Sequence, residues 1–299
     1  LRHWSYHPDF VEQGLGNAHE GLQTVRFDSV IVCDQRSHVF FLAQQKYLVA
    51  PFLSSVYLSS VEQRQELVYF DRYEQVTKSE GIYGEKPLRW TYETFLGRLA
   101  LEGVIKRPWF SAAYGRWADC SCSRKEVEAF IERFEIDTDE FLHSVDSFAN
   151  FNDFFSRELK DTARPLAEGE NTVSFPADGR HLFVPNLSEA GSIYAKGQHF
   201  DLVSLLGDGV LANQFEGGSA LVSRLCPTDY HRFHFPLAGT SSEPALINGP
   251  LYSVNPIALS RSLGFIWKNK RRVTVLDQSL VGRYLFLEIG ATNVGSIVD

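Results

Sequence analysis

Two histidines are the residues of this sequence whose type and spacing best suit acid–base chemistry. His231 and His234 lie three residues apart in the run Asp229–His234, which also contains two aromatic residues. Aromatic neighbours give an imidazole low-dielectric surroundings, and we expect at least one of the two to titrate near neutrality. In an extended segment, positions i and i+3 point to opposite faces, which predicts separate roles unless a turn joins them. A structural role for either histidine, satisfied by hydrogen bonds, is an equal alternative.

A third candidate, Asp178, stands in the run Pro176-Ala177-Asp178-Gly179. Proline and glycine around an aspartate favour a tight turn that presents the carboxylate. An aspartate that orients a histidine, which in turn activates a hydroxyl, is the logic of acyl transfer. Asp-Gly is also a common turn dipeptide, so a plain turn is the alternative. Lys196-Gly197 is a further polar stretch of the same half of the chain.

Metal binding has little support in the sequence. Cys120 and Cys122 form a lone pair without a second cysteine or histidine cluster at zinc spacing. His231 and His234 have no obvious third ligand. We therefore expect no metal.

Helices dominate the region before residue 160. Ser123 and Glu126 have the spacing of a capping box, and the residues that follow repeat on one helical face. A second helix is expected to begin near Asp137, and a third, shorter one to start at Phe151. The expected apolar faces are Val127, Phe130, Ile131 and Phe134 in the first helix, Phe141, Leu142, Val145 and Phe148 in the second, and Phe151, Phe154 and Phe155 in the third.

After Lys160 the pattern changes to short apolar runs separated by turn residues, which is typical of strands. The expected strands are residues 219–225, 251–254, 272–276 and 284–289, and residues 30–32 could form one more near the N-terminus. Helices first and strands later indicate an α+β fold, an N-terminal helical region followed by a mainly antiparallel β domain. The pattern is not the alternating one that accompanies dinucleotide binding.

Composition narrows the function classes. The chain has 299 residues with 44% hydrophobic residues, enough for one large or two smaller folded domains. Its formal charge of -8 argues against non-specific nucleic-acid binding. Four irregularly spaced cysteines do not form a secreted disulfide framework. Because methionine is absent, we expect a processed, trimmed or fragmentary chain.

One segment has the character of a membrane surface. Leu96, Leu99, Val104 and Ile105 form a rough apolar stripe, which ends in the basic and aromatic run Lys106–Phe110. A helix packed on its own core is the equal alternative. The most apolar window, residues 39–58, contains Lys46, Pro51 and two glutamines, which argues against a membrane-spanning helix.

The sequence resembles the phosphatidylserine decarboxylase family over roughly residues 82 to 299. The resemblance rests on the order and spacing of several motifs, which are Tyr83-Gly84-Glu85-Lys86, Phe151–Lys160, Ala163-Arg164-Pro165, Pro176–Gly179, Lys196-Gly197, Asp229–His234, Leu251–Pro256 and Gly290–Ile297. Within the family it is similar to the bacterial branch with a longer N-terminal helical part.

The resemblance implies a proenzyme that makes its own pyruvoyl cofactor by cleaving itself at a Gly-Ser-Thr motif. It implies that Asp178 and His234 act with that serine as a charge relay, that His231 serves the decarboxylation step, and that Ser253 contacts the lipid. The substrate is then phosphatidylserine and the product phosphatidylethanolamine. Loss of carbon dioxide leaves electrons on carbon, and a pyruvoyl carbonyl joined to the lipid amine is a sink for them.

The chain departs from the family pattern in one respect, because no Gly-Ser-Thr tripeptide occurs in it. We therefore expect the chain by itself to lack the pyruvoyl precursor and to be inactive. The expected partners are a pyruvoyl-bearing small subunit, a membrane surface and a second copy of the chain in a homodimer. The expected location is peripheral on a membrane, at its cytoplasmic face.

The expected organisation is an unassigned segment (residues 1–70), a helical region that could associate with a membrane (71–160) and a C-terminally incomplete β-rich catalytic domain (161–299). A degenerate homologue that binds phospholipid or a partner without catalysis is the alternative function. A serine hydrolase that uses His234 and Asp178 is a third reading, although the sequence has no nucleophile-elbow motif.

Overall fold

The computed structural model describes residues 29–33, 47–48, 68–71, 75–165, 173–188, 201–278 and 282–296. The Lys196-Gly197 stretch, the last three residues and nearly all of the apolar window at 39–58 lie outside the described residues.

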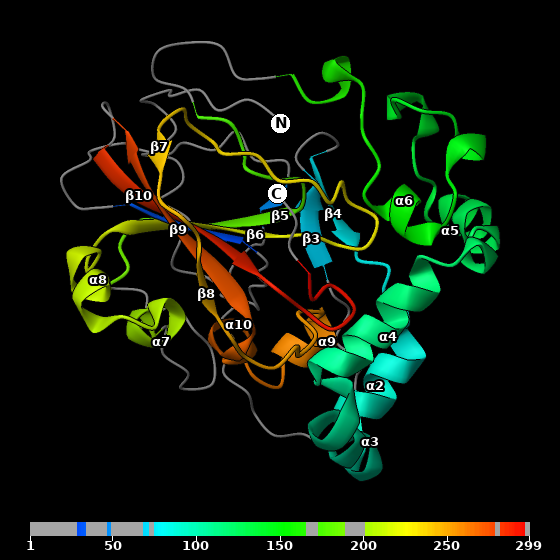
Figure 1. Cartoon of the computed structure of the whole chain (residues 1–299), viewed down its shortest axis with the longest axis horizontal. Coiled ribbons are helices and arrows are strands. Elements are labelled where there is room, and N and C mark those ends of the chain that lie inside the picture. The colour runs from blue at the N-terminus through cyan, green and yellow to red at the C-terminus, as the bar shows by residue number, and fades with distance from the viewer. Residues whose placement is uncertain are drawn as a thin grey trace.

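A mixed, mostly antiparallel sheet forms the centre of the molecule (Figure 1). Its described strands are β1 (Ser29–Cys33), β2 (Tyr47–Leu48), β3 (Val68–Asp71), β4 (Val76–Ser79), β5 (Arg180–Val184), β6 (Ser219–Arg224), β7 (Thr240–Ser241), β8 (Ala245–Ile247), β9 (Arg271–Gln278) and β10 (Gly282–Ile289). The strand order is β4-β3-β2-β5-β6-β1-β10-β9-β7, and β8 also pairs with β9. The pairing of β2 with β5 is parallel.

The middle of this sheet is built from segments that lie far apart in the sequence. Strand β1 pairs antiparallel with both β6 and β10, and Val30 is opposite Val222 on one side and Leu287 on the other. The predicted strands at 30–32, 219–225, 272–276 and 284–289 are therefore confirmed. Buried side chains of β6, β9 and β10 form the main core with the short helices that cover the sheet.

Helices precede most of the sheet in the sequence and gather beside it (Figure 1). They are α2 (Glu85–Glu93), α3 (Phe95–Ala100), the π-helical turn η1 (Leu101–Ile105), α4 (Pro108–Ala118), α5 (Lys125–Phe134) and α6 (Phe151–Phe155), with 3-10 turns η2 (Ser121–Ser123), η3 (Thr138–Glu140), η4 (Val145–Ser147) and η5 (Asp161–Ala163). Later short helices, α7 (Leu202–Leu206), α8 (Gly209–Gln214), α9 (Pro256–Leu259) and α10 (Phe265–Lys268), lie against the sheet. The α+β prediction is confirmed.

A cluster of phenylalanines holds α5 and α6 together. Phe154 is fully buried, and its ring lies 5.7 Å from those of Phe130, Phe148 and Phe151, in edge or tilted arrangements. Aromatic pairs in these geometries add to the stabilisation gained from burial. The predicted helices at Val127–Phe134 and Phe151–Phe155 are confirmed, with the predicted faces inward.

The helix predicted from Asp137 is wrong. The turns η3 (Thr138–Glu140) and η4 (Val145–Ser147) stand there instead, as two separate 3-10 turns. The chain between them pairs with a distant segment, since the N–H of Leu142 donates to Glu158 and the N–H of Lys160 donates to Glu140. These backbone bonds replace the helical ones. Phe141 and Phe148 are still buried, whereas Leu142 is exposed.

The capping box at Ser123 is also absent. The Ser123 hydroxyl donates to the carbonyls of Ala118 and Cys120 and accepts from the N–H of Phe151. The fully buried side chain therefore ties the end of α4 to the start of α6. Helix α5 begins at Lys125 without a side-chain cap.

Residues 251–254 do not form the predicted strand. Three of their N–H groups bond to partners outside the sheet. Leu251 donates to the carbonyl of Lys106, Tyr252 to the side chain of Asn269 and Ser253 to the hydroxyl of Tyr92. The segment joins the helical region to the sheet.

Candidate functional site

Two of the predicted motifs meet at one end of the sheet. Pro176–Gly179 directly precedes β5 and Asp229–His234 follows β6, and these strands pair with Arg180 opposite Arg224. The backbone N–H of His234 donates to the carbonyl of Pro176 at 2.7 Å. Gly179 has a φ of 131°, and a Cβ there would lie 2.2 Å from the carbonyl oxygen of Arg224. Only glycine lets the loop approach β6 this closely.

His231 lies against an aromatic ring within this site. Its imidazole is 3.9 Å from the ring of Phe155, measured between centroids, and its Nδ1 is 2.9 Å from the backbone carbonyl oxygen of Asp229. Burial lowers the pKa of His231 to about 4, outweighing the hydrogen bond to Asp229. The low-dielectric surroundings are as predicted, and His231 titrates below neutrality; that at least one of the two imidazoles titrates near neutrality stays a prediction.

His234 has different surroundings. Its imidazole is exposed and lies parallel to the ring of Tyr230, with 6.1 Å between the centroids. Partial desolvation lowers its pKa. The two histidines thus occupy separate environments, as expected for an extended segment.

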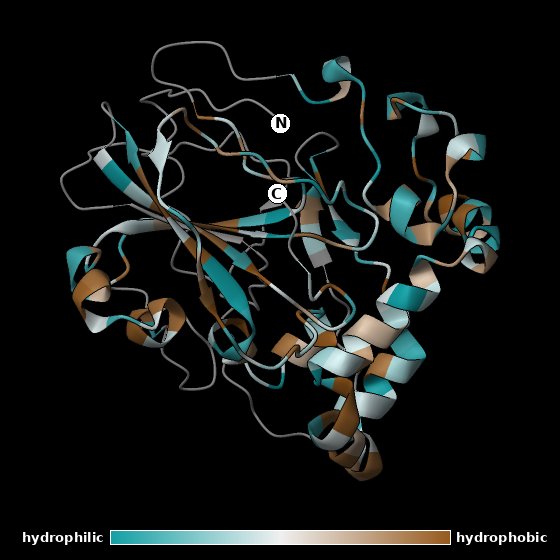
Figure 2. Ribbon diagram, in the orientation of Figure 1, coloured by the Kyte–Doolittle hydropathy of each residue, from teal (hydrophilic) through white to brown (hydrophobic). Residues whose placement is uncertain are grey.

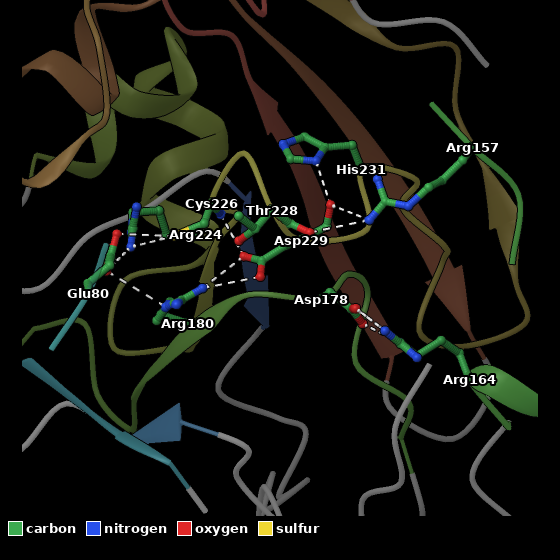
Figure 3. Close-up of polar contacts among 10 residues, drawn as sticks. All are labelled: Glu80, Arg157, Arg164, Asp178, Arg180, Arg224, Cys226, Thr228, Asp229 and His231. Atoms are coloured by element: carbon green, nitrogen blue, oxygen red, sulfur yellow. Dashed lines mark hydrogen bonds and ion pairs between the residues drawn. The ribbon is translucent and has the colours of Figure 1, made fainter. Parts of the chain in front are cut away.

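Asp178 forms a two-pronged ion pair. Arg164 donates from Nε to both carboxylate oxygens, at 2.9 and 3.0 Å, and from Nη2 to one of them at 2.7 Å (Figure 3). Nη1 of Arg164 also bonds to Glu140 at 2.8 Å. These partners raise the pKa of the Arg164 guanidinium, although burial alone lowers it. Arg164 was part of a recognised motif, but its residue type gave no signal that it would hold Asp178.

A second group of buried charges fixes the segment that carries His231. Arg180 donates to both carboxylate oxygens of Asp229, at 3.1 and 3.2 Å, and lies 3.7 Å from Glu80 (Figure 3). Glu80 also accepts hydrogen bonds from Arg224 and from the thiol of Cys226. Burial raises the pKa of Cys226 to about 12, so the thiol is protonated at neutral pH and is no nucleophile.

Arg157 approaches the same segment from the helical side. Its Nη2 donates to the carbonyls of Thr228 and Asp229 at 3.2 and 3.5 Å. Its guanidinium carbon lies 5.1 and 5.0 Å from the ring centroids of Phe141 and Phe154. Arg157 and Asp229 stood in recognised motifs and Arg180 did not, but the sequence suggested a role for none of them, because the partners that join them lie 49 to 72 residues away.

A cavity of about 240 Å³ lies between these groups. Its lining joins the helical side to both motif loops, and includes Glu140, Phe141, Arg157, Arg164, Asp178, Asp229 and Tyr230. Asp178 and the segment before His231 therefore share one hollow, bordered by two arginines.

Ser253 lies elsewhere. Its N–H donates to Tyr92 of α2, and its hydroxyl accepts from the N–H of Asn255 at 3.1 Å. These contacts are with α2 and the start of α9, and not with the residues around His231.

Helix α3 and its neighbours carry apolar residues at one end of the molecule (Figure 2). Several of these side chains are exposed and are here termed the α3 patch. The α3 patch consists of Phe95, Leu96, Leu99, Val104 and Trp109. Leu96 is 66% and Leu99 57% exposed. Of the predicted stripe, Ile105 alone packs inward.

Lys106, at the start of the predicted basic run, also turns inward. It donates to the hydroxyl of Tyr252 at 2.8 Å and pairs with Glu102, and the hydroxyl of Tyr252 donates to Glu102 at 2.9 Å. Arg107 stays exposed beside the patch. The segment at the α3 patch is thereby joined to residues 251–254.

In the described parts of the chain, no three histidine, cysteine or acidic side chains are grouped as a metal site. The described helices include none with the length and apolar character needed to cross a membrane.

Comparison with known proteins identifies close relatives. The family model for phosphatidylserine decarboxylase matches residues 151–299. The chain is 42% identical over 230 residues to the phosphatidylserine decarboxylase proenzyme of Clostridium perfringens, an alignment that spans 76% of this chain and 78% of that protein. It is 40% identical over 233 residues to the proenzyme of Chlamydia muridarum (78% of this chain, 77% of that protein) and 38% identical over 235 residues to that of Fusobacterium nucleatum (79% and 78%).

Proposed function

The chain belongs to the phosphatidylserine decarboxylase family, and from this we propose that it acts on phosphatidylserine, releasing carbon dioxide and leaving phosphatidylethanolamine. At the level of the family it is a carboxy-lyase. The observation that carries the proposal for this chain is the meeting of Pro176–Gly179 with Asp229–His234, through the 2.7 Å bond from the N–H of His234 to Pro176.

The proposal includes a pyruvoyl group as the cofactor. When bound, it supplies a carbonyl that withdraws the electrons left on carbon as carbon dioxide departs. The donor set fits such a group, because the Asp178 carboxylate lines the cavity together with Asp229 and Tyr230, and the same segment continues into the half-buried imidazole of His231 and the exposed imidazole of His234. Asp178, His231 and His234 are the residues that would border it. No Gly-Ser-Thr tripeptide occurs in residues 1–299, so on this proposal the precursor serine lies outside them and residues 1–299 alone are inactive.

His231 is assigned to the decarboxylation step. A carbonyl oxygen only accepts hydrogen bonds, so Nδ1 of His231 carries the hydrogen in its contact with Asp229. Nε2 is then the atom that takes up and releases a proton. An anionic substrate next to Nε2 raises the pKa of the imidazole. His231 can then hold a proton when substrate is bound, although it is neutral in the protein without substrate. That proton is returned to the carbon that has lost carbon dioxide.

His234 and Asp178 are assigned to self-cleavage. The exposed imidazole of His234 is accessible to a serine hydroxyl brought to the site by another segment. It is suited to remove the proton of that hydroxyl, with Asp178 as the group that orients it. Arg164 holds the carboxylate of Asp178 in place. On this proposal the cleaved product includes a small subunit that carries the pyruvoyl group.

The α3 patch is proposed as the surface that meets the membrane. Apolar side chains exposed on short helices, with Arg98 and Arg107 exposed beside them, suit an interface of acyl chains and anionic headgroups. Lys106, at the end of the helices that carry this surface, bonds to Tyr252, the residue before Ser253, and this link supports the proposal that Ser253 contacts lipid. Peripheral attachment at the cytoplasmic face and a homodimer remain predictions.

The test uses the native protein, with its processing serine, on vesicles that contain phosphatidylserine. We expect formation of phosphatidylethanolamine and a pyruvoyl-blocked subunit in the mass spectrum. The variant His231→Ala should be cleaved normally and form no product, and His143→Ala, which removes an exposed histidine, should behave as wild type. A fully active His231→Ala protein would contradict the assigned role, and an uncleaved, inactive wild type would favour the non-catalytic homologue.

A further inference from the structure

Asp229 connects more elements of the site than any residue chosen from the sequence. Its backbone carbonyl accepts from Nδ1 of His231 at 2.9 Å and from Nη2 of Arg157 at 3.5 Å. Its carboxylate accepts two bonds from Arg180 and one, of 2.6 Å, from the N–H of Cys226. Figure 3 shows Arg157 and His231 converging on this carbonyl while Arg180 holds the carboxylate.

Arg180 anchors Asp229 to the sheet. It is the first residue of β5, opposite Arg224 of β6, and its guanidinium carbon lies 4.5 Å from the ring centroid of Tyr69. Glu80 lies close to both arginines, 3.7 Å from Arg180. The charge of Asp229 is thus balanced within a buried group of alternating charges, which limits the side-chain positions open to it.

Arg157 holds Asp229 from the other side. It is 5% exposed, and its Nε and Nη1 have no hydrogen-bond partner among the described residues. The rings of Phe141 and Phe154 lie against the guanidinium and offset part of the cost of burying it. The bonds from Nη2 to the carbonyls of Thr228 and Asp229 therefore join the phenylalanine cluster to the segment that carries His231.

We infer that Asp229 is a positioning residue for His231, and that Arg180 and Arg157 hold it for this task. Its carbonyl fixes the imidazole in the tautomer with hydrogen on Nδ1, so that Nε2 faces the reaction as the proton carrier. The inference rests on the proposed function for its catalytic meaning, but the tautomer is a property of the protein without substrate. The charged groups that act on His231 are Asp229, Arg157 and Asp178.

The first measurement is nitrogen-15 NMR of the histidine-labelled native protein at pH 7. The His231 signals are assigned by their loss in His231→Gln. We expect a neutral imidazole with hydrogen on Nδ1 in wild type. Hydrogen on Nε2 in wild type would overturn the inference, whatever the enzymatic activity. If the Nδ1 tautomer is found and no phosphatidylserine is decarboxylated, the proposed function fails and the tautomer assignment stands.

The second measurement compares Arg180→Gln, Arg180→Lys and the matched control Arg283→Gln, which removes an exposed arginine paired with Asp277. Arg180→Gln should give a mixed tautomer and lower kcat by on the order of tenfold at an unchanged KM, whereas Arg180→Lys should recover most of both. The control should match wild type. If Arg180→Gln does not fold, Arg180→Lys alone decides. An Arg180→Lys protein that loses the Nδ1 tautomer but keeps the wild-type kcat would show that the tautomer does not matter for catalysis, and would overturn the inference.

Discussion

The guanidinium of Arg164 and the carboxylate of Asp178 form a two-pronged pair, with Nε 2.9 Å from one oxygen and Nη2 2.7 Å from the other. Such a fork fixes the plane of a carboxylate as well as its distance. Asp178 belongs to the loop before β5, and Arg164 follows the turn η5 (Asp161–Ala163) of the helical region. The orientation of the proposed relay aspartate therefore depends on a residue from the other part of the fold.

This pair makes self-cleavage sensitive to both partners. In the proenzyme that includes the processing serine, Asp178→Asn should give only the uncleaved band on a denaturing gel, and Arg164→Gln should slow cleavage by roughly tenfold or more, because the orienting group is lost or misplaced. Asp277→Asn, in the exposed pair with Arg283, serves as the control and should cleave at the wild-type rate. Normal cleavage of Asp178→Asn would show that Asp178 has no part in the relay.

His231 should make stability depend on pH between its unfolded and folded pKa values. Burial lowers the pKa from 6.5 to about 4, so between these values the unfolded chain binds a proton that the folded protein does not. The stabilisation is fully present above pH 6.5 and is lost as the pH falls towards 4, a loss of about 2 to 3 kcal/mol by pH 4.5.

Urea unfolding at pH 7 and pH 4.5 measures this loss. The difference in unfolding free energy between the two pH values should be smaller in His231→Gln than in wild type by that amount. His143→Gln, which removes an exposed histidine, serves as the matched control for the loss of a histidine. Equal pH dependence in wild type and His231→Gln would mean that the imidazole is not desolvated as the structure has it.

The phenylalanine cluster predicts a large stability effect at Phe154, whose ring also lies against the guanidinium of Arg157. Phe154→Ala removes a fully buried ring that lies against four other rings, and should lower the unfolding free energy by about 3 to 5 kcal/mol. Leu142→Ala, at a position the sequence pattern placed in the core, should change it by less than about 0.5 kcal/mol because Leu142 is 49% exposed. Denaturant titration of the two variants measures both changes in unfolding free energy. A similar decrease in both variants would mean that Leu142 is buried in the core.

The α3 patch predicts vesicle binding that can be separated from chemistry. The double variant Leu96→Asp/Leu99→Asp should weaken binding to phosphatidylserine vesicles by at least about tenfold, because two apolar side chains no longer enter the interface. Activity on a short-chain, water-soluble phosphatidylserine should not change. Val203→Asp/Val210→Asp carries the same added charge on α7 and α8 and should bind as wild type. If both double variants weaken vesicle binding equally, the added negative charge explains the loss and the α3 patch does not.

The sequence pattern predicted the elements whose own residues decide them. Helix α5 follows from apolar positions at helical spacing, and β9 and β10 follow from runs of β-branched and aromatic residues. The pattern failed at residues 138–147 and 251–254, where apolar spacing is correct but the backbone bonds to distant groups. The helix or strand propensity of a short segment carries no information about a hydrogen-bond partner, such as Glu158 or Asn269, that lies elsewhere in the chain.

The candidate site residues also divide into those that the sequence reveals and those that only the fold reveals. The sequence alone singled out His231, His234 and Asp178 as candidates, because reactive residue types in recognisable motifs are visible without the fold. Only the tertiary structure decided that Arg164 holds Asp178 and that Asp229, between Arg157 and Arg180, holds His231. It also decided that Leu96 and Leu99 face outward while Lys106 turns in to Tyr252. Ion pairs and burial depend on which segments the fold brings together, and that follows from packing over the whole chain and not from any one stretch of it.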